Sequence, residues 1–287
     1  MKITTNNGRL ELGFKQWLFP GGEIGIQLNE ESIKSTYFWR DGVYITARIQ
    51  NSNDLFTLAL MRDAILRVKK VPIHLILPYI PYGRQDKAHN PGESLSLKVF
   101  ADYLNFLNFE SVTTFDCHSE VTNAVINNLK EVKRLDILKN LIYDRENELY
   151  KLLLNKQCLL ISPDVGANKK IHDIAAHFGH DHFIRADKLR ELQTGKIIET
   201  IVYVDDLNYQ TVVILDDIAD GARTFIELAK VLKKKNAGRI ILYVTHGIFS
   251  KGYKDILEVI DEVYTTNSFQ ELPYPYPQDK IHVIKVA

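Results

Sequence analysis

Short runs of valine, isoleucine and leucine recur along the chain without regular alternation with polar residues. The runs are Val43–Ile49, Ile73–Ile80, Val112–Cys117, Cys158–Ser162, Val212–Leu215, Arg239–Thr245 and Ile281–Val286. Strands that are covered on both faces have this composition, because both sets of side chains meet apolar neighbours. The runs therefore predict a parallel sheet that is buried between layers of helices.

Helix-like stretches separate these runs. They are Leu55–Val68, Leu95–Leu107, Asn168–Phe178, Phe225–Lys235 and Tyr253–Glu258. Alternation of strands and helices predicts an α/β fold. Because a domain usually has about 100–200 residues, the 287 residues of the chain predict two domains. The charged stretch 127–156 is the expected junction, which gives an N-terminal domain 1–140 and a C-terminal domain 141–287.

Charge and composition exclude several classes of partner. The 36 basic and 36 acidic residues cancel, so we expect no general attraction to nucleic acid or to an anionic membrane. No apolar run approaches the roughly 20 residues that span a bilayer, and the first residues lack the apolar core of a signal peptide. Cys117 and Cys158 lie in apolar runs, and we interpret them as buried thiols of a cytoplasmic protein.

The stretch LDDIADGART, residues 215–224, combines an acidic pair with a short loop before a helix. Backbone N–H groups at a helix start bind phosphate, so Asp220–Thr224 is a candidate phosphate loop. Asp216 and Asp217 would repel a bare phosphate, and they are better suited to sugar hydroxyls or a cation. An ordinary βα loop with a capping Asp is an equally good interpretation of this stretch alone.

Polar side chains also follow three other predicted strands. Arg84, Gln85 and Asp86 follow the second run and suit a polyphosphate attached to a polar ring. His118 follows the third run and Asp164 the fourth, and the two could share Mg²⁺ or perform acid–base chemistry. Taken singly, each of these residues is better explained by a structural hydrogen bond or a solvated loop.

Several motifs occur in a fixed order along the chain. They are Phe19-Pro-Gly-Gly-Glu23, Pro78-Tyr-Ile-Pro-Tyr-Gly-Arg-Gln-Asp-Lys87, Asp116-Cys-His-Ser119, Ser162-Pro-Asp-Val-Gly166, Asp187-Lys-Leu-Arg190 and Thr245-His-Gly-Ile-Phe-Ser250. Together they resemble the ribose-phosphate pyrophosphokinase family, the phosphoribosyl pyrophosphate synthetases, and the compact length resembles its shorter members. The resemblance covers nearly the whole chain.

The resemblance implies a fold, a reaction and partners. It implies two domains with type I phosphoribosyltransferase-like parallel sheets flanked by helices. The implied reaction transfers the β,γ-diphosphoryl group of ATP to the 1-hydroxyl of ribose 5-phosphate, which gives phosphoribosyl pyrophosphate and AMP. The implied cofactor is Mg²⁺, and the implied assembly is a homodimer or a larger homo-oligomer in which a neighbouring subunit completes the adenine pocket.

The resemblance also assigns roles to individual residues. ATP would be bound in the N-terminal domain by Phe19, Gly21, Glu23, Arg84, Gln85, Asp86 and His118. Ribose 5-phosphate would be bound in the C-terminal domain by Asp216, Asp217, Asp220, Gly221, Ala222, Arg223 and Thr224. Mg²⁺ would be placed by His118 and Asp164, and Lys188 and Arg190 would be the catalytic residues that neutralise developing charge.

Two departures from the family pattern keep other functions open. Arg223 replaces a glycine of the phosphate loop, and Gly21 stands where the family often has Asp. A non-catalytic relative that regulates such synthetases is one alternative, and a phosphoribosyltransferase that consumes phosphoribosyl pyrophosphate is another. On local pattern alone, the stretch 187–190 is also typical of the start of an exposed charged helix.

Overall fold

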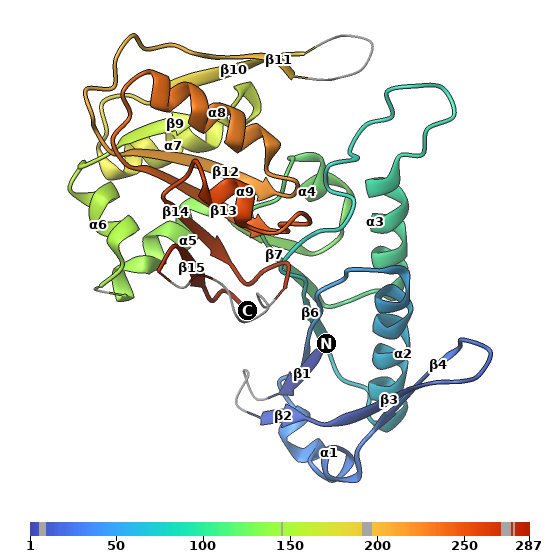
Figure 1. Ribbon diagram of the computed structural model, residues 1–287. Helices are drawn as coiled ribbons and strands as arrows, with labels where there is room; N and C mark the ends of the chain where they lie inside the picture. Colours follow the sequence, from blue (N-terminus) through green and yellow to red (C-terminus); the bar gives the residue numbers. More distant parts are fainter. Residues whose placement is uncertain (6–9, 145, 191–196, 271–276, 278) are drawn as a thin grey trace. The chain divides into compact units, whose positions relative to one another are not determined.

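The apolar runs form two main sheets, each in its own part of the chain (Figure 1). The structure is a computed structural model and describes residues 1–5, 10–144, 146–190, 197–270, 277 and 279–287. It divides into a first unit of residues 1–132 with Ala287 and a second unit of residues 133–286. The α/β class predicted from the sequence is confirmed.

The sheet of the first unit has six strands in the order β2-β1-β5-β6-β7-β8. The strands are β1 (Lys2–Thr5), β2 (Leu10–Leu12), β5 (Val43–Thr46), β6 (Ile73–Ile76), β7 (Ser111–Phe115) and β8 (Leu129–Val132). β5 to β8 are parallel, whereas β1 runs antiparallel to both of its neighbours. β3 (Phe14–Leu18) and β4 (Ile24–Leu28) form a separate antiparallel hairpin.

Two long helices cover this sheet and provide most of the helical contribution to the first core. They are α2 (Ser52–Val68) and α3 (Ser96–Leu107); the short helices are α1 (Glu30–Lys34), η1 (Thr36–Trp39) and α4 (Val121–Val125). Asn51 and Asp54 cap α2 reciprocally, because each side chain accepts a hydrogen bond from the other residue's backbone N–H. Leu58 of α2 and Leu104 of α3 are buried in one cluster with Ile45 and Leu75 of the sheet.

The sheet of the second unit has seven strands in the order β11-β10-β9-β12-β13-β14-β15. They are β9 (Leu159–Ser162), β10 (Ile184–Arg190), β11 (Ile197–Val202), β12 (Val212–Ala219), β13 (Ile240–Gly247), β14 (Glu262–Thr266) and β15 (Ile281–Ile284). The helical elements are α5 (Arg134–Asn140), η2 (Leu141–Tyr143), α6 (Glu148–Leu154), η3 (Val165–Ala167), α7 (Asn168–Phe178), α8 (Arg223–Lys234) and α9 (Lys254–Leu257). All strand pairs are parallel except β10–β11.

Strand β12 is covered on both faces, as its composition predicted. Val212 and Ile214 are buried in a cluster with α8, and Val213 and Leu215 in a second cluster with α5, α6 and α7. Side chains alternate between the two faces of a strand, so Asp216 continues the α8 face and Asp217 the α5–α7 face.

The structure adds strands that the apolar pattern missed and divides the chain slightly earlier than predicted. β14, with the sequence EVYTT, mixes polar and apolar residues, and β1 to β4 are short and partly polar. The division lies after Val132, because α5 packs Leu138 into the second unit's core. Cys117 and Cys158 are both buried, and burial raises the pKa of the Cys158 thiol to about 12.

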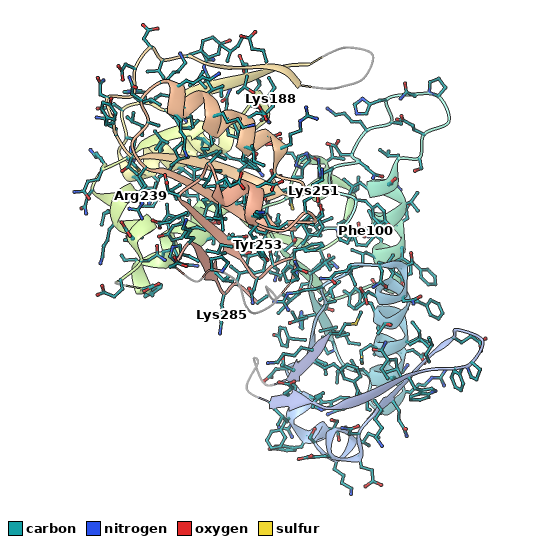
Figure 2. All side chains as sticks on the ribbon, in the orientation of Figure 1. Phe100, Lys188, Arg239, Lys251, Tyr253 and Lys285 are labelled. Carbon is teal, nitrogen blue, oxygen red and sulfur yellow. The ribbon has the colours of Figure 1, made fainter. Side chains whose placement is uncertain are left out.

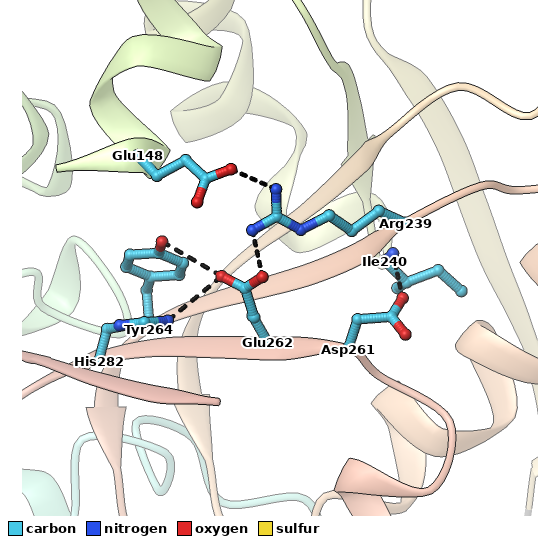
Figure 3. A network of polar contacts seen from close by, with 7 residues as sticks. All are labelled: Glu148, Arg239, Ile240, Asp261, Glu262, Tyr264 and His282. Atoms are coloured by element: carbon cyan, nitrogen blue, oxygen red, sulfur yellow. Dashed lines mark hydrogen bonds and ion pairs between the residues drawn. The ribbon is translucent and has the colours of Figure 1, made fainter. Parts of the chain in front are cut away.

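A network of charged groups ties the amino end of the second sheet to helix α6 (Figure 3). Arg239 donates to Glu148, the first residue of α6, and to Glu262, the first residue of β14. Glu262 also accepts a hydrogen bond from Tyr264 Oη at 3.4 Å and lies 3.2 Å from His282 Nε2. The Arg239 guanidinium lowers the pKa of Glu148. The network joins three elements that are distant in sequence, so it should contribute more than a simple surface pair.

We expect Arg239→Met to destabilise the protein by about 1–3 kcal/mol, because it leaves the partly buried carboxylate of Glu262 and the exposed one of Glu148 without their donor. The matched control is Lys230→Met, which removes the exposed Lys230–Glu227 pair on α8 and should cost less than about 1 kcal/mol. Urea unfolding measures both. Equal effects of the two variants would contradict the special role of Arg239.

Candidate active site at the carboxyl ends of the strands

The carboxyl ends of β9 and β12 bring two polar stretches of the second unit together. The two strands are parallel neighbours, with Ile214 opposite Ile161. One residue, Pro163, separates Asp164 from the end of β9, and one residue, Leu215, separates Asp216 from Ile214. The Asp164 carboxylate is close enough to act on the charge of Asp216. Ligands in open α/β sheets bind at this edge, so the sequence-predicted residues of the second unit lie where a site is expected.

The acidic pair itself is strongly perturbed. Asp217 is buried, Asp216 is half-buried, and the Asp217 N–H donates to Asp216 Oδ1 at 2.9 Å. Burial, and next the Asp217 carboxylate, raise the pKa of Asp216 well above its ordinary value, and the positive charge of Arg134 opposes that rise. Perturbed carboxylates of this kind are typical of functional sites.

Arg134 is a buried positive charge that acts on Asp216, and the sequence analysis missed it. It is the first residue of α5 and is only 2% exposed. Helix α5 packs on the face of β12 toward which Asp217 is directed by strand alternation. Its sequence context, KEVKRLDILK, is a charged stretch of the predicted junction. Nothing local distinguishes a buried arginine there from a solvated one.

The predicted phosphate loop is the beginning of α8. Helix α8 has Ala222 as its N-cap and contains no acidic residue in its first turn. An alanine cap offers no side-chain acceptor to the first N–H groups, which therefore require another acceptor such as water or an anion. Ala222 has φ 54°, a left-handed conformation that is unfavourable for a residue with a Cβ atom. Strained residues of this kind cluster at functional sites.

Lys188 lies on strand β10, so the alternative of an exposed helix over 187–190 is wrong. Its side chain is 7% exposed, and its Nζ atom is 2.8 Å from Asp164 Oδ2. The other Asp164 oxygen accepts a hydrogen bond from the Ala167 N–H at 3.2 Å. Arg190 is the last residue of β10, and its side chain lies outside the described part of the structure. The structure thus joins the predicted catalytic lysine to a predicted metal ligand.

In the first unit, the predicted ATP residues fall into two groups. The loop with Arg84, Gln85 and Asp86 lies beside His118, because a Cβ atom added at Gly83 would be 3.7 Å from His118 Cβ. Gln85 also accepts a backbone hydrogen bond from Leu97 at the start of α3. The structure therefore brings together the ends of β6 and β7 as the sequence predicted.

The second group lies on the β3–β4 hairpin. Phe19 and Glu23 close its tip, since the Phe19 N–H donates to the Glu23 carbonyl at 2.8 Å. Gly21 and Gly22 form the turn, and Gly22 has φ 90°. Figure 1 shows this hairpin and the loop before α3 at opposite ends of the helical layer of the first unit. The structure does not bring Phe19, Gly21 and Glu23 to Arg84 within one chain.

The donor set suits Mg²⁺ only in combination with a substrate. The described residues contain no group of three or more His, Cys, Asp or Glu side chains that could hold a metal ion. Mg²⁺ commonly takes one or two carboxylates and completes its shell with water and substrate phosphates. The oxygen atoms of Asp164 fit that partial role.

Within the described residues, no helix is both long and apolar enough to cross a membrane.

These features define an α/β protein of two sheets, with a helix start and an acidic pair at the sheet edge where ligands of open α/β folds bind. Two family models match the chain: "N-terminal domain of ribose phosphate pyrophosphokinase" over residues 11–107 and "Phosphoribosyl synthetase-associated domain" over residues 182–287. The fold is similar to that of a phosphoribosylpyrophosphate synthetase from Mycobacterium smegmatis. The TM-score is 0.77 at 22% identity, over 96% of this chain and 86% of that one.

Two relatives extend the similarity along the sequence. The ribose-phosphate pyrophosphokinase of Wolinella succinogenes is 30% identical over 272 residues, 94% of this chain and 82% of that protein. The enzyme of the same name from Mycoplasmopsis pulmonis is 29% identical over 275 residues, 94% of this chain and 81% of that protein. The chain therefore belongs to the ribose-phosphate pyrophosphokinase family.

We expect Asp216→Asn to stabilise the protein at neutral pH, by about 0.5–2 kcal/mol, as is common for substitutions that relieve a strained functional site. The folded-state pKa of Asp216 is raised above its ordinary value of 3.8. Its contribution to stability is therefore complete below about pH 4 and is lost as pH rises through the folded-state pKa. The asparagine does not ionise, so it avoids this loss.

Melting temperatures of both proteins between pH 4 and pH 8 test this prediction. The variant's advantage should be absent near pH 4 and should grow as pH rises. Asp205→Asn, in an exposed loop after β11, is the control and should show no such trend. A variant that is less stable than wild type at pH 8 would show that Asp216 is a net stabilising charge.

Proposed function

We propose that this protein transfers the β,γ-diphosphoryl group of ATP to the 1-hydroxyl of ribose 5-phosphate, forming phosphoribosyl pyrophosphate and AMP. The observation that carries the proposal is the end of β12. There, an acidic pair precedes a helix whose first turn contains no acid, in a chain that belongs to the ribose-phosphate pyrophosphokinase family.

The second unit would hold the sugar phosphate. The 5-phosphate would accept hydrogen bonds from N–H groups of Asp220, Gly221, Ala222, Arg223 and Thr224 and from the Thr224 hydroxyl, in the field of the α8 amino terminus. Asp216 and Asp217 would hold ribose hydroxyls. Since the pKa of Asp216 is raised, its carboxyl group can be protonated over part of the pH range and can then donate as well as accept.

The first unit would hold ATP. Arg84 would bind the phosphates, with Gln85, Asp86 and His118 beside it. Phe19, Gly21 and Glu23 would contact the adenine of a neighbouring subunit, which agrees with the separation of the hairpin tip from the Arg84 loop. Trp17, Leu18 and Phe19 are 41%, 64% and 46% exposed, as expected if this hairpin meets a second copy. The proposal thus includes a homodimer or larger homo-oligomer, and a cytoplasmic location.

Mg²⁺ would be held by Asp164 and His118 together with phosphate oxygens of ATP. When bound, it would supply neutralising charge on the triphosphate. The Asp164 carboxylate pairs with the ammonium of Lys188 at 2.8 Å, which supports its assignment as a counterion for positive charge. The site therefore suits either a lysine or a metal ion as counterion of Asp164.

Lys188 and Arg190 would stabilise the charge that develops during transfer. The ribose 1-oxygen attacks the β-phosphorus, the bond to the α-phosphate oxygen breaks, and negative charge builds up on AMP and the transferred group. Donors that are in position before the reaction stabilise such charge most effectively. Lys188 lies on a strand, and its side chain is 7% exposed and paired with Asp164, which supports a donor whose position is set before the substrate binds.

The purified chain should convert ATP to AMP, and only when Mg²⁺ and ribose 5-phosphate are both present. Chromatography of the nucleotides measures this. ADP as the product would indicate an ordinary sugar kinase and reject the proposal. Binding of both ligands without turnover would favour the non-catalytic, regulatory alternative. Phosphoribosyltransferase activity on a supplied base and phosphoribosyl pyrophosphate would favour the other alternative.

Lys188→Ala should lower turnover by about 10²–10³-fold, a typical loss for one preorganised donor, while the Kd for ATP changes much less. The reason is that the lysine would act on charge present mainly in the transition state. Lys230→Ala, on the exposed face of α8, is the control. Equal losses in turnover and in ATP affinity would assign Lys188 to ground-state binding.

A further inference from the structure

The motif Thr245-His-Gly-Ile-Phe-Ser250 has no role in the proposed function so far. In the structure, the loop after it is bonded to the base of the phosphate loop. The N–H groups of Ile248 and Phe249 both donate to the carbonyl of Ala219, at 2.8 and 3.1 Å. Ala219 is the last residue of β12 and directly precedes Asp220. The ends of β12 and β13 are therefore held in one backbone arrangement.

The residues that follow this anchor form a tight and well-supported turn. Phe249 has φ 48° and Gly252 has φ 74°, and the Gly252 N–H donates to the Phe249 carbonyl at 2.8 Å. The Phe249 side chain is buried in the core shared with α8, and its ring lies 5.1 Å from that of Tyr253. These contacts fix the backbone position of Lys251 between Phe249 and Gly252.

The side chain of Lys251 extends over the phosphate loop. A Cβ atom added at Gly221 would lie 3.7 Å from Lys251 Cε and 3.9 Å from Lys251 Cδ. Figure 2 shows Lys251 toward the end of the second unit to which the arrow of β12 points. Lys251 is exposed, and within the described parts of the chain its ammonium group takes part in no hydrogen bond or ion pair. The stem of Lys251 thus lies against the loop at Gly221, and no counterion for its charge is found among the described residues.

We propose that Lys251 is a phosphate-binding residue that reaches the 5-phosphate of the sugar substrate from the loop after β13. This inference rests on the proposed function and assigns that function a further specificity residue. Gly221 matters because it has no side chain, which lets the stem of Lys251 lie against the loop backbone. The ammonium group, one bond beyond Cε, then lies within reach of an anion bound to the loop.

A second cation has a physical purpose at this position. Asp216, Asp217 and Asp220 place acidic groups near a dianionic phosphate and oppose its binding. Arg223, at the start of α8, is exposed and lies on the other chain segment of the loop. Lys251 approaches from β13, so a phosphate in the loop would meet positive charge from two different elements. Such an arrangement selects for a phosphorylated sugar over a neutral one.

Calorimetric titration of ribose 5-phosphate, ribose and ATP into the full-length protein tests the inference. Lys251→Gln removes the charge and keeps most of the aliphatic stem, so folding should be retained. We expect the Kd for ribose 5-phosphate to rise about tenfold, as for loss of one exposed charge-assisted hydrogen bond. The Kd for ATP should not change, and Lys251→Arg should recover most of the affinity.

Lys254→Gln, on the exposed first turn of α9, is the matched control and should leave the Kd for ribose 5-phosphate unchanged. Wild-type affinity in Lys251→Gln would overturn the role of Lys251 and leave the proposed function intact. An equal loss of affinity for ATP, or an equal loss in Lys254→Gln, would also overturn it, since the effect would not be local. Failure of the wild-type protein to bind ribose 5-phosphate would reject the proposed function itself.

Discussion

A buried strand that carries two adjacent carboxylates near its carboxyl end is the constraint on which the second unit depends. Val212 to Leu215 are fully covered by two apolar cores, and Asp216 continues the strand beside them, still paired with β13, in a low-dielectric setting. Charge there is costly unless it is paired. Arg134 and the Asp217 backbone N–H offset part of that cost. The part of this cost that is not offset raises the pKa of Asp216. A raised carboxyl pKa of this kind is typical of residues that serve binding rather than stability.

Strand β12 pairs with one strand on each side, and each neighbour adds charged residues to this edge. β9 leads into the loop with Asp164, whose carboxylate pairs with Lys188. β13 on the other side is bonded through its loop to Ala219 and carries Lys251. Positive groups from three separate elements therefore lie along this edge: Arg134 of α5 acts on Asp216, Lys188 of β10 pairs with Asp164, and Lys251 after β13 lies against Gly221. Because parallel strands end at one edge, this convergence follows from the topology and needs no long irregular loop.

The sequence predicted this edge well where the signal was local. The apolar run before Asp216 and the loop before α8 are contiguous in sequence, so their pattern identified both. The sequence pattern did not identify charged residues that reach this edge from distant parts of the chain. Arg134 and Lys251 lie 82 and 35 residues from Asp216, in stretches with ordinary composition. The stretch around Lys188 could be mistaken for a helix because its charged residues hide the pairing of β10 with β11. Only the fold makes that segment a strand.

The ion pair between Lys188 and Asp164 suggests an order of events for the proposed reaction. The Asp164 carboxylate already accepts from Lys188 at Oδ2 and from the Ala167 N–H at Oδ1. If Asp164 also helps to hold Mg²⁺, which would supply neutralising charge, Lys188 would share that carboxylate and could turn to substrate phosphates as a second counterion. Lysine suits this role better than arginine, since its compact charge needs no bidentate partner. The resting pair would thus keep Lys188 ordered and buried until its substrate binds.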